Sequence, residues 1–175
     1  PFIRMMAGYT DYTPGGMRNA AKADFQPVYS KPMTMGTRAH QVALYTVYDS
    51  PLTMLCDVPT AYEKEPQTLA YLASMPRIYE EERVLDGKLG EYIVVARKAK
   101  GSWYLGGLTS WTARNIEIDF SFLGEGTWTV ELYRDGVNAD RDAEDYKIEK
   151  FTVRNTDSRS IRLASGGGFS MKITR

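Results

Sequence analysis

The sequence predicts a mixed fold in two parts, the last βα units of an α/β barrel over residues 1–76 and an all-β antiparallel sandwich over residues 77–175. In the first part, short apolar runs alternate with helical periodicity, which is βα order. In the second part, short segments with a period of two are separated by turn residues, which is typical of an antiparallel sandwich or barrel. The boundary lies near Pro76, where the pattern changes.

The first predicted strand and helix lie in the N-terminal half. Phe2–Ala7 is a short apolar run that ends at Gly8 and leads into a long loop rich in proline and glycine. Thr37 is suited to cap the N-terminus of a helix, because its hydroxyl can accept a backbone N–H of the first turn. The apolar residues that then recur at helical spacing form one stripe: Ala39, Val42, Ala43 and Val47.

A second strand and helix follow in the same order. Ser50-Pro51 stops the first helix, and Leu52–Cys56 is another short apolar run. Pro66 suits the first turn of a second helix that ends at Pro76. The apolar face of this helix comprises Leu69, Leu72, Ala73 and Met75. Because a parallel strand needs neighbours on both sides, the strands missing from this β-α-β-α segment are expected upstream of the chain.

Beyond Pro76, at least seven strands are predicted, each with one face that can be buried. They are Glu91–Lys98, Trp103–Thr109, Arg114–Phe120, Thr127–Arg134, Tyr146–Val153, Ser160–Leu163 and Phe169–Ile173. Turn residues separate several of them, at Lys100-Gly101, Gly124–Gly126, Asp135-Gly136 and Gly166–Gly168.

Composition and charge exclude several classes of function. Lysine plus arginine and aspartate plus glutamate balance at 22 each, and the basic residues form no long run, so nucleic acid is not expected as a partner. No apolar stretch approaches the roughly 20 residues of a membrane-spanning helix, so no span is expected. A lone Cys56 forms no intrachain disulfide. The sequence begins at Pro1 without an initiator methionine or a signal segment, which predicts a piece of a larger folded protein.

Two aspartates follow the predicted strands, at the strand ends where a barrel presents its catalytic groups. Asp11 and Asp57 are therefore candidate carboxylates, and the alternative for each is an aspartate that forms a turn or caps a loop. His40 is the only histidine, and no metal-ligand spacing accompanies it. The Glu80-Glu81-Glu82 run is interpreted as a solvated face that joins the two halves.

Three features of the second half have a structural and a functional interpretation. Gly166–Gly168 precedes a strand rather than a helix, so a tight turn explains it better than a phosphate-binding loop. Asp135–Asp142 has closely spaced oxygen donors but lacks the glutamate and glycine of an EF-hand, so a long hairpin connection is favoured. Trp103, Trp111 and Trp128 can stack on sugar rings, although tryptophans in a sandwich are more often core residues.

Several motifs, in one order along the chain, carry a family resemblance. They are PFIRMMAGYTDYTPGGM at Pro1–Met17, GTRAHQVALYTVYDS at Gly36–Ser50 with Pro51–Pro59 behind it, Leu85–Arg97, Trp103–Phe122, DGVNADRDAEDY at Asp135–Tyr146, and the closing ASGGGF. Together they resemble glycoside hydrolase family 97, the family of bacterial α-glucosidases and α-galactosidases. The motifs up to Pro59 are similar to the end of the family's barrel, and the later ones to its C-terminal β-domain.

The resemblance implies a parent of three parts: an N-terminal β-sandwich, a central (β/α)8 catalytic barrel and a C-terminal β-sandwich. This chain would hold the end of the barrel and the closing sandwich. The parent is expected to be an exo-acting hydrolase of α-linked glucosides or galactosides, with retention and inversion both open. Its catalytic carboxylates and calcium-binding glutamates are expected upstream. No catalytic residue and no metal ligand is therefore assigned to this chain, and calcium belongs to the parent.

Arg4, Asp11 and Tyr12 are predicted to line the wall of the sugar pocket. The oligosaccharide is expected to bind the parent barrel, and the other partner is the remainder of the same polypeptide. The resemblance also implies a periplasmic parent. Two alternatives stay open: a carbohydrate-binding module, which predicts an exposed row of tryptophans, and a structural domain that binds no sugar.

Overall fold

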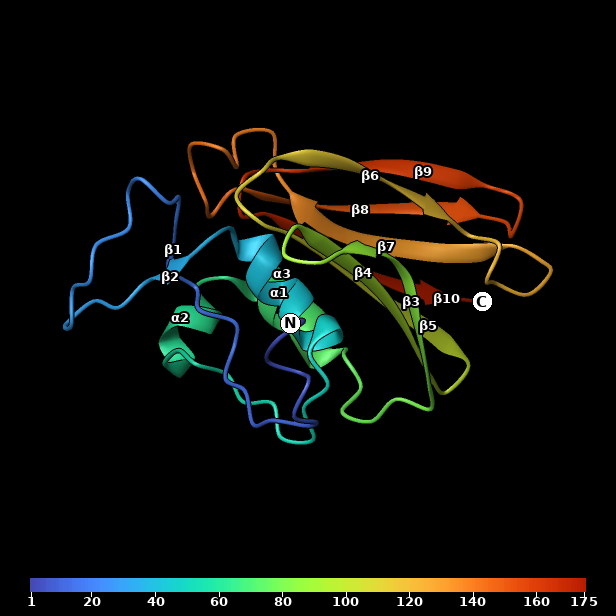
Figure 1. The fold of residues 1–175 in the computed structure, drawn as a ribbon, viewed down its shortest axis with the longest axis horizontal. Helices are drawn as coiled ribbons and strands as arrows, with labels where there is room; N and C mark the ends of the chain where they lie inside the picture. Colours follow the sequence, from blue (N-terminus) through green and yellow to red (C-terminus); the bar gives the residue numbers. More distant parts are fainter.

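The structure is a computed structural model that describes residues 1–175, and its centre is a six-stranded antiparallel sheet (Figure 1). In spatial order this sheet contains β3 (Glu81–Lys88), β4 (Tyr92–Ala99), β5 (Ser102–Thr109), β10 (Gly168–Thr174), β7 (Trp128–Asp135) and β8 (Tyr146–Val153). A second sheet pairs β6 (Arg114–Asp119) with β9 (Ser158–Leu163) and lies over one face of the first. The chain is thus mostly antiparallel β-structure, arranged as a sandwich.

Helices cover the other face of the large sheet. α1 (Arg38–Val47) and α3 (Pro66–Ala73) lie on this face, and α2 (Pro59–Glu63) packs against α3. The Thr37 side chain accepts a hydrogen bond from the backbone N–H of His40, and Pro66 occupies the first turn of α3, so both predicted helix starts are confirmed. None of the three helices has the length and apolar content that crossing a membrane requires.

Two apolar interfaces hold the layers together. Between the sheets, side chains such as Leu105 and Leu132 of the large sheet meet Ile118 and Ile161 of the small one, all almost fully buried. Between helix and sheet, Ala43, Leu44 and Val47 of α1 pack against Val95 and Leu108. Each fully buried aliphatic side chain contributes about 1.5–3 kcal/mol relative to exposure, so both interfaces stabilise the fold substantially.

Consecutive glycines at the centre of β5 make room for α1 on one face of the sheet and for the side chain of a neighbouring strand on the other. A Cβ atom at Gly106 would lie 2.8 Å from Val47 Cγ2 and 2.9 Å from the carbonyl oxygen of Ala43, both in α1. A Cβ atom at Gly107 would overlap the ring of Phe169 on the neighbouring strand. The glycine pair therefore sets the close spacing between α1, β5 and β10.

The two strands predicted in the N-terminal half do not form, so that part of the prediction is wrong. Phe2–Ala7 is a run of turns, with Ile3 and Met6 exposed. Leu52–Cys56 makes only an isolated parallel bridge, between Tyr12 and Thr53. Regular pairing in this half is limited to the parallel two-residue strands β1 (Asn19–Ala20) and β2 (Thr34–Met35). A parallel strand needs partners on both sides. Within residues 1–76, Phe2–Ala7 pairs with no strand, and Leu52–Cys56 pairs on one side only, with residues 12–14.

All seven strands predicted in the second half are present, with ends that differ by one or two residues. An eighth strand, β3, was not predicted, because its residues Glu81 and Glu82 were interpreted as a solvated face. The backbone N–H of Glu80 donates to the carbonyl of Lys98 at 2.8 Å, and the pairing with β4 continues from Glu81 onward. Asp135–Asp142 begins the connection between β7 and β8, as predicted.

Candidate functional site

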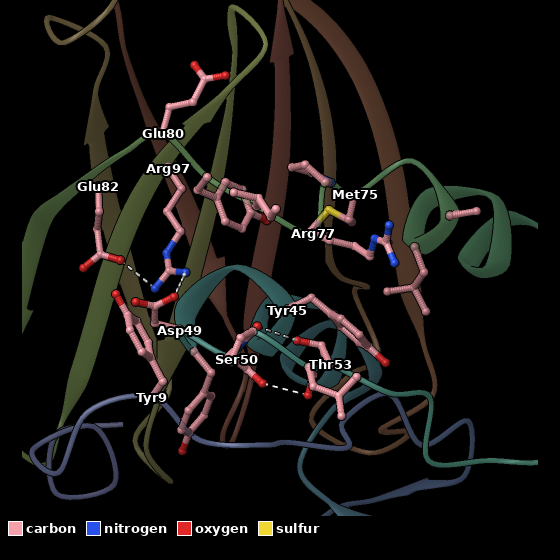
Figure 2. Close-up of a pocket in the computed structure, with 18 of the residues that line it drawn as sticks. Tyr9, Tyr45, Asp49, Ser50, Thr53, Met75, Arg77, Glu80, Glu82 and Arg97 are labelled. Atoms are coloured by element: carbon pink, nitrogen blue, oxygen red, sulfur yellow. Dashed lines mark hydrogen bonds and ion pairs between the residues drawn. The ribbon is translucent and has the colours of Figure 1, made fainter.

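A cleft of about 660 Å³ opens between the helical layer and the β3 end of the large sheet (Figure 2). Its walls are residues 49–55, which follow α1, residues 75–80, which follow α3, and the outer face of β3 and β4. Four tyrosines line it: Tyr9, Tyr45, Tyr48 and Tyr79. The volume lies within the range of about 300–1,000 Å³ that small-molecule sites occupy.

Arg97 is the only arginine in the cleft that is buried, with 3% of its surface exposed. Figure 2 shows its guanidinium between two carboxylates, at 3.2 Å from Asp49 and 2.5 Å from Glu82. The same group lies over the ring of Tyr79, 5.3 Å from its centroid. Burial raises the pKa of Tyr79 to about 12, so its hydroxyl stays protonated. Both acids are already engaged by a cation, and the arrangement ties the end of α1 to the sheet rather than forming a free acid–base pair.

The three residues predicted to line the sugar pocket lie on the N-terminal segment. Arg4 is exposed and donates a hydrogen bond to the hydroxyl of Thr10. The Asp11 side chain is exposed, and Tyr12 is half-buried and stacked on Tyr48 with ring centroids 4.6 Å apart. Burial raises the pKa of Tyr12 above its usual value. Contact of these residues with a sugar stays a prediction.

Residues 11–17, hereafter the DYTPGGM loop, are held by side chains from the helical layer. The hydroxyl of Tyr45 donates to the Pro14 carbonyl at 2.9 Å, and that of Tyr62 donates to the Gly15 carbonyl at 2.8 Å. The backbone N–H of Gly15 donates to Gln41 Oε1 at 3.2 Å. These three side chains satisfy consecutive backbone groups of a buried turn.

Asp57 supplies a further anchor for the same loop. Its Oδ2 accepts a hydrogen bond from the backbone N–H of Met17 at 3.1 Å, and its Oδ1 accepts one from the N–H of Val58 at 3.0 Å, just before α2. Of the two interpretations given to Asp57, the structure supports the loop-capping aspartate. No group of three or more His, Cys, Asp or Glu side chains is arranged to hold a metal ion anywhere in the chain.

Arg38, at the start of α1, joins the loop, the helices and the sandwich. Its guanidinium pairs with Glu65 at 2.7 Å and Glu144 at 3.1 Å, and it donates to the carbonyl of Met17 and to Asn19 Oδ1. Glu144 also accepts a hydrogen bond from the backbone N–H of Asn19 at 3.2 Å. The β7–β8 connection of the sandwich therefore contacts Asn19, two residues after the DYTPGGM loop, and is linked to the loop itself through Arg38.

A second buried polar centre fastens the N-terminus of α1 to the sandwich. Asp135, at the end of β7, accepts hydrogen bonds from the Thr37 hydroxyl at 2.6 Å and from the backbone N–H groups of Ala164 at 2.8 Å and Gly168 at 3.1 Å. Burial raises the pKa of Asp135 to about 6 despite these donors. Burial also lowers the pKa of His40, whose Nδ1 lies 3.1 Å from the Gly167 carbonyl. A neutral imidazole with its hydrogen on Nδ1 fits this contact, because a carbonyl oxygen only accepts.

The tryptophans do not form an exposed row. Trp103 and Trp128 are 3% and 6% exposed and belong to the core between the sheets. Trp111 is 38% exposed, and its ring lies 5.5 Å from the ammonium group of Lys22. The surface that a carbohydrate-binding sandwich would present is therefore not formed by these side chains.

Comparison with known protein families identifies the family to which the sandwich belongs. Residues 78–174 match the family model described as glycosyl-hydrolase 97 C-terminal, oligomerisation. The chain belongs to glycoside hydrolase family 97. The family 97 resemblance drawn from the sequence motifs is thereby confirmed, and the matched residues cover all eight strands of the sandwich.

Curated relatives of this family 97 chain extend the match to its N-terminal half. A retaining α-galactosidase from Bacteroides thetaiotaomicron is 51% identical over 173 residues, which cover 99% of the chain and 26% of the relative. A probable retaining α-galactosidase from Streptomyces bingchenggensis is 29% identical over 170 residues. A solved family 97 enzyme from Pseudoalteromonas sp. strain K8, in complex with acarbose, has 33% identity and a TM-score of 0.85 over 98% of the chain. The chain spans about a quarter of the length of these relatives.

Proposed function

We propose that the polypeptide containing this chain is an exo-acting glycoside hydrolase that cleaves α-linked galactosides and retains the configuration at the anomeric carbon. The observation that carries the proposal is the 51% identity, over 99% of the chain, to a retaining α-galactosidase. An α-glucoside is the second candidate substrate, because a solved relative with 33% identity was crystallised with acarbose. The higher identity favours the galactoside.

In this proposal the chain is a non-catalytic part of the enzyme. Residues 1–76 belong to the end of a (β/α)8 barrel whose remaining strands lie upstream and would pair with the runs that form no strand in this chain, and residues 77–175 close the enzyme as a sandwich. Five apolar side chains of the N-terminal segment, between 46% and 85% exposed, offer a surface for the rest of the barrel: Ile3, Met6, Leu52, Met54 and Leu55. They lie on two segments, residues 3–6 and 52–55, and such exposed apolar side chains are typical of a surface that another part of a protein covers.

The chemistry requires two carboxyl groups that this chain does not supply. A retaining glycosidase places its nucleophile and its acid–base about 5–5.5 Å apart on either side of the scissile bond. We assign both groups, and the ligands of the calcium ion expected in the parent, to residues upstream. The chain has no cluster of acids that fits calcium. The parent is proposed to act in the periplasm on oligosaccharides.

Hydrolysis of p-nitrophenyl α-galactoside and p-nitrophenyl α-glucoside tests the proposal. The complete polypeptide should cleave the galactoside faster, the 175-residue chain should cleave neither, and EDTA should reduce the activity of the complete polypeptide. Proton NMR of the first product should show the α-anomer of galactose before mutarotation. Cleavage by the isolated chain, or a β-anomer as first product, would contradict the assignment.

A further inference from the structure

Side chains of the helical layer bind the backbone of the DYTPGGM loop at its turn, Pro14 and Gly15. Between Pro14 and Gly15, two carbonyl oxygens and one N–H have partners from Tyr45, Tyr62 and Gln41. The Pro14 carbonyl has a second donor, the backbone N–H of Cys56 at 3.2 Å, whereas the only hydrogen bond to the Gly15 carbonyl comes from Tyr62. Tyr62 thus has no substitute in this arrangement.

Gly15 and Gly16 lie so close to neighbouring side chains that a larger residue would not fit at either position. Gly15 has a φ of +89°, a conformation that favours glycine, and a Cβ atom there would lie 2.6 Å from the hydroxyl oxygen of Tyr45. A Cβ atom at Gly16 would lie 2.7 Å from Thr34 Cγ2. The backbone is therefore held in one conformation by close contact as well as by hydrogen bonds.

The held segment is continuous with the residues predicted to line the sugar pocket. Tyr12 is two residues before Pro14, its carbonyl accepts a hydrogen bond from the N–H of Met54 at 3.1 Å, and its ring stacks on Tyr48. Asp11 precedes it with an exposed side chain. A displacement of the turn at Gly15 would move both residues, because only Thr13 and Pro14 separate the turn from Tyr12, and Asp11 is the next residue.

We propose that Tyr62 is a positioning residue for substrate binding, with Tyr45 in a secondary role. Their hydroxyls fix the DYTPGGM loop so that Asp11 and Tyr12 form one wall of the glycoside pocket. Neither tyrosine needs to touch the sugar. The inference rests on the proposed function and adds to it the residues that hold the pocket wall.

Tyr62→Phe in the complete polypeptide is the direct test, with Tyr71→Phe as matched control. Both tyrosines are buried, at 2% and 3% exposure, and Tyr71 donates a single hydrogen bond, to Ser170 Oγ at 3.1 Å, away from the loop. In Tyr62→Phe the KM for the better of the two p-nitrophenyl substrates should rise about tenfold, with kcat changed less, because a displaced wall weakens binding. Tyr71→Phe should lower the melting temperature less, because the Tyr62 hydroxyl also accepts a hydrogen bond from the backbone N–H of Asp57 at 3.2 Å, and it should leave KM unchanged.

Hydrogen exchange distinguishes a local loosening of the DYTPGGM loop from a general loss of stability. Amide hydrogen exchange at Gly15, Gly16 and Met17 should accelerate in Tyr62→Phe and not in Tyr71→Phe. Tyr45→Phe, a half-buried and milder change, should raise KM less than Tyr62→Phe, because the Pro14 carbonyl keeps its second donor. If the wild type cleaves one substrate and both buried variants have its KM, the positioning role is wrong. If the wild type cleaves neither, the proposed function itself is wrong.

Discussion

Arg38 joins three segments of the fold, and its replacement by methionine is expected to lower the free energy of unfolding by about 2–4 kcal/mol. The side chain is 2% exposed and makes ion pairs with Glu65 and Glu144, which are 28% and 41% exposed. Breaking a fully buried pair costs about 3–5 kcal/mol. Both glutamates are partly exposed, so water solvates their unpaired carboxylates and the loss is smaller. The buried carbonyl of Met17 also loses a donor, which adds about 1–3 kcal/mol.

Urea unfolding of the 175-residue chain, followed by tryptophan fluorescence, measures this loss, because Trp103 and Trp128 lie in the core between the sheets. Arg162→Met is the matched control. Arg162 also pairs with a carboxylate, that of Asp140, but the two side chains are 51% and 41% exposed. An exposed pair contributes about 0–1 kcal/mol, and the control should change little. Equal losses in the two variants would refute the argument that burial and the loop contact make Arg38 important.

Three further changes test the packing and the titration of the fold. Gly107→Ala should cost about 1–3 kcal/mol or more in urea unfolding, because the added methyl overlaps the Phe169 ring; an unchanged midpoint would contradict that contact. Leu132→Ala should cost about 2–5 kcal/mol, whereas Val137→Ala, at an 87% exposed position, should stay within about 0.5 kcal/mol. His40→Asn should make the melting temperature fall less steeply from pH 7 to pH 5. Burial holds the pKa of His40 in the folded chain below its usual value of 6.5, so protonation favours the unfolded chain and stability is lost as the pH falls below 6.5. Identical pH profiles would show that His40 does not titrate as a buried group.

Elements with a local signal could be predicted from the sequence. The cap at Thr37 and the proline at the start of α3 act within one helical turn, so neighbouring residues determine them. The alternation of Ile116, Ile118 and Phe120 marks one buried face of β6 and its end, and all three side chains are buried. Where one face of a strand is apolar and the other polar, the alternation of residues along the sequence predicts both the strand and the face that is buried.

Elements that depend on distant partners could not be predicted in this way. Strand β3 lies at the edge of the large sheet and is mostly exposed, so it lacks the alternation of the inner strands. Phe2–Ala7 has the composition of a strand but pairs with no strand of this chain, and it forms turns. Arg97, Asp49 and Glu82 meet in the cleft from three separate segments, and no spacing along the sequence relates them. Their association follows only from the packing of α1 on the sheet.

Helix α1 links the stability of the sandwich to the position of the DYTPGGM loop. One face contributes Ala43 and Val47 to the interface with the large sheet, while Gln41 and Tyr45 hold the loop. Its N-terminus is fixed to the sandwich through Thr37 and Asp135. Because the same ten residues carry both sets of contacts, a change in the sandwich that moves α1 must also move the loop. Under the proposed function, the sandwich would influence substrate binding through the placement of one helix, and variants of Asp135 that shift α1 should affect the KM of the complete polypeptide as well as stability.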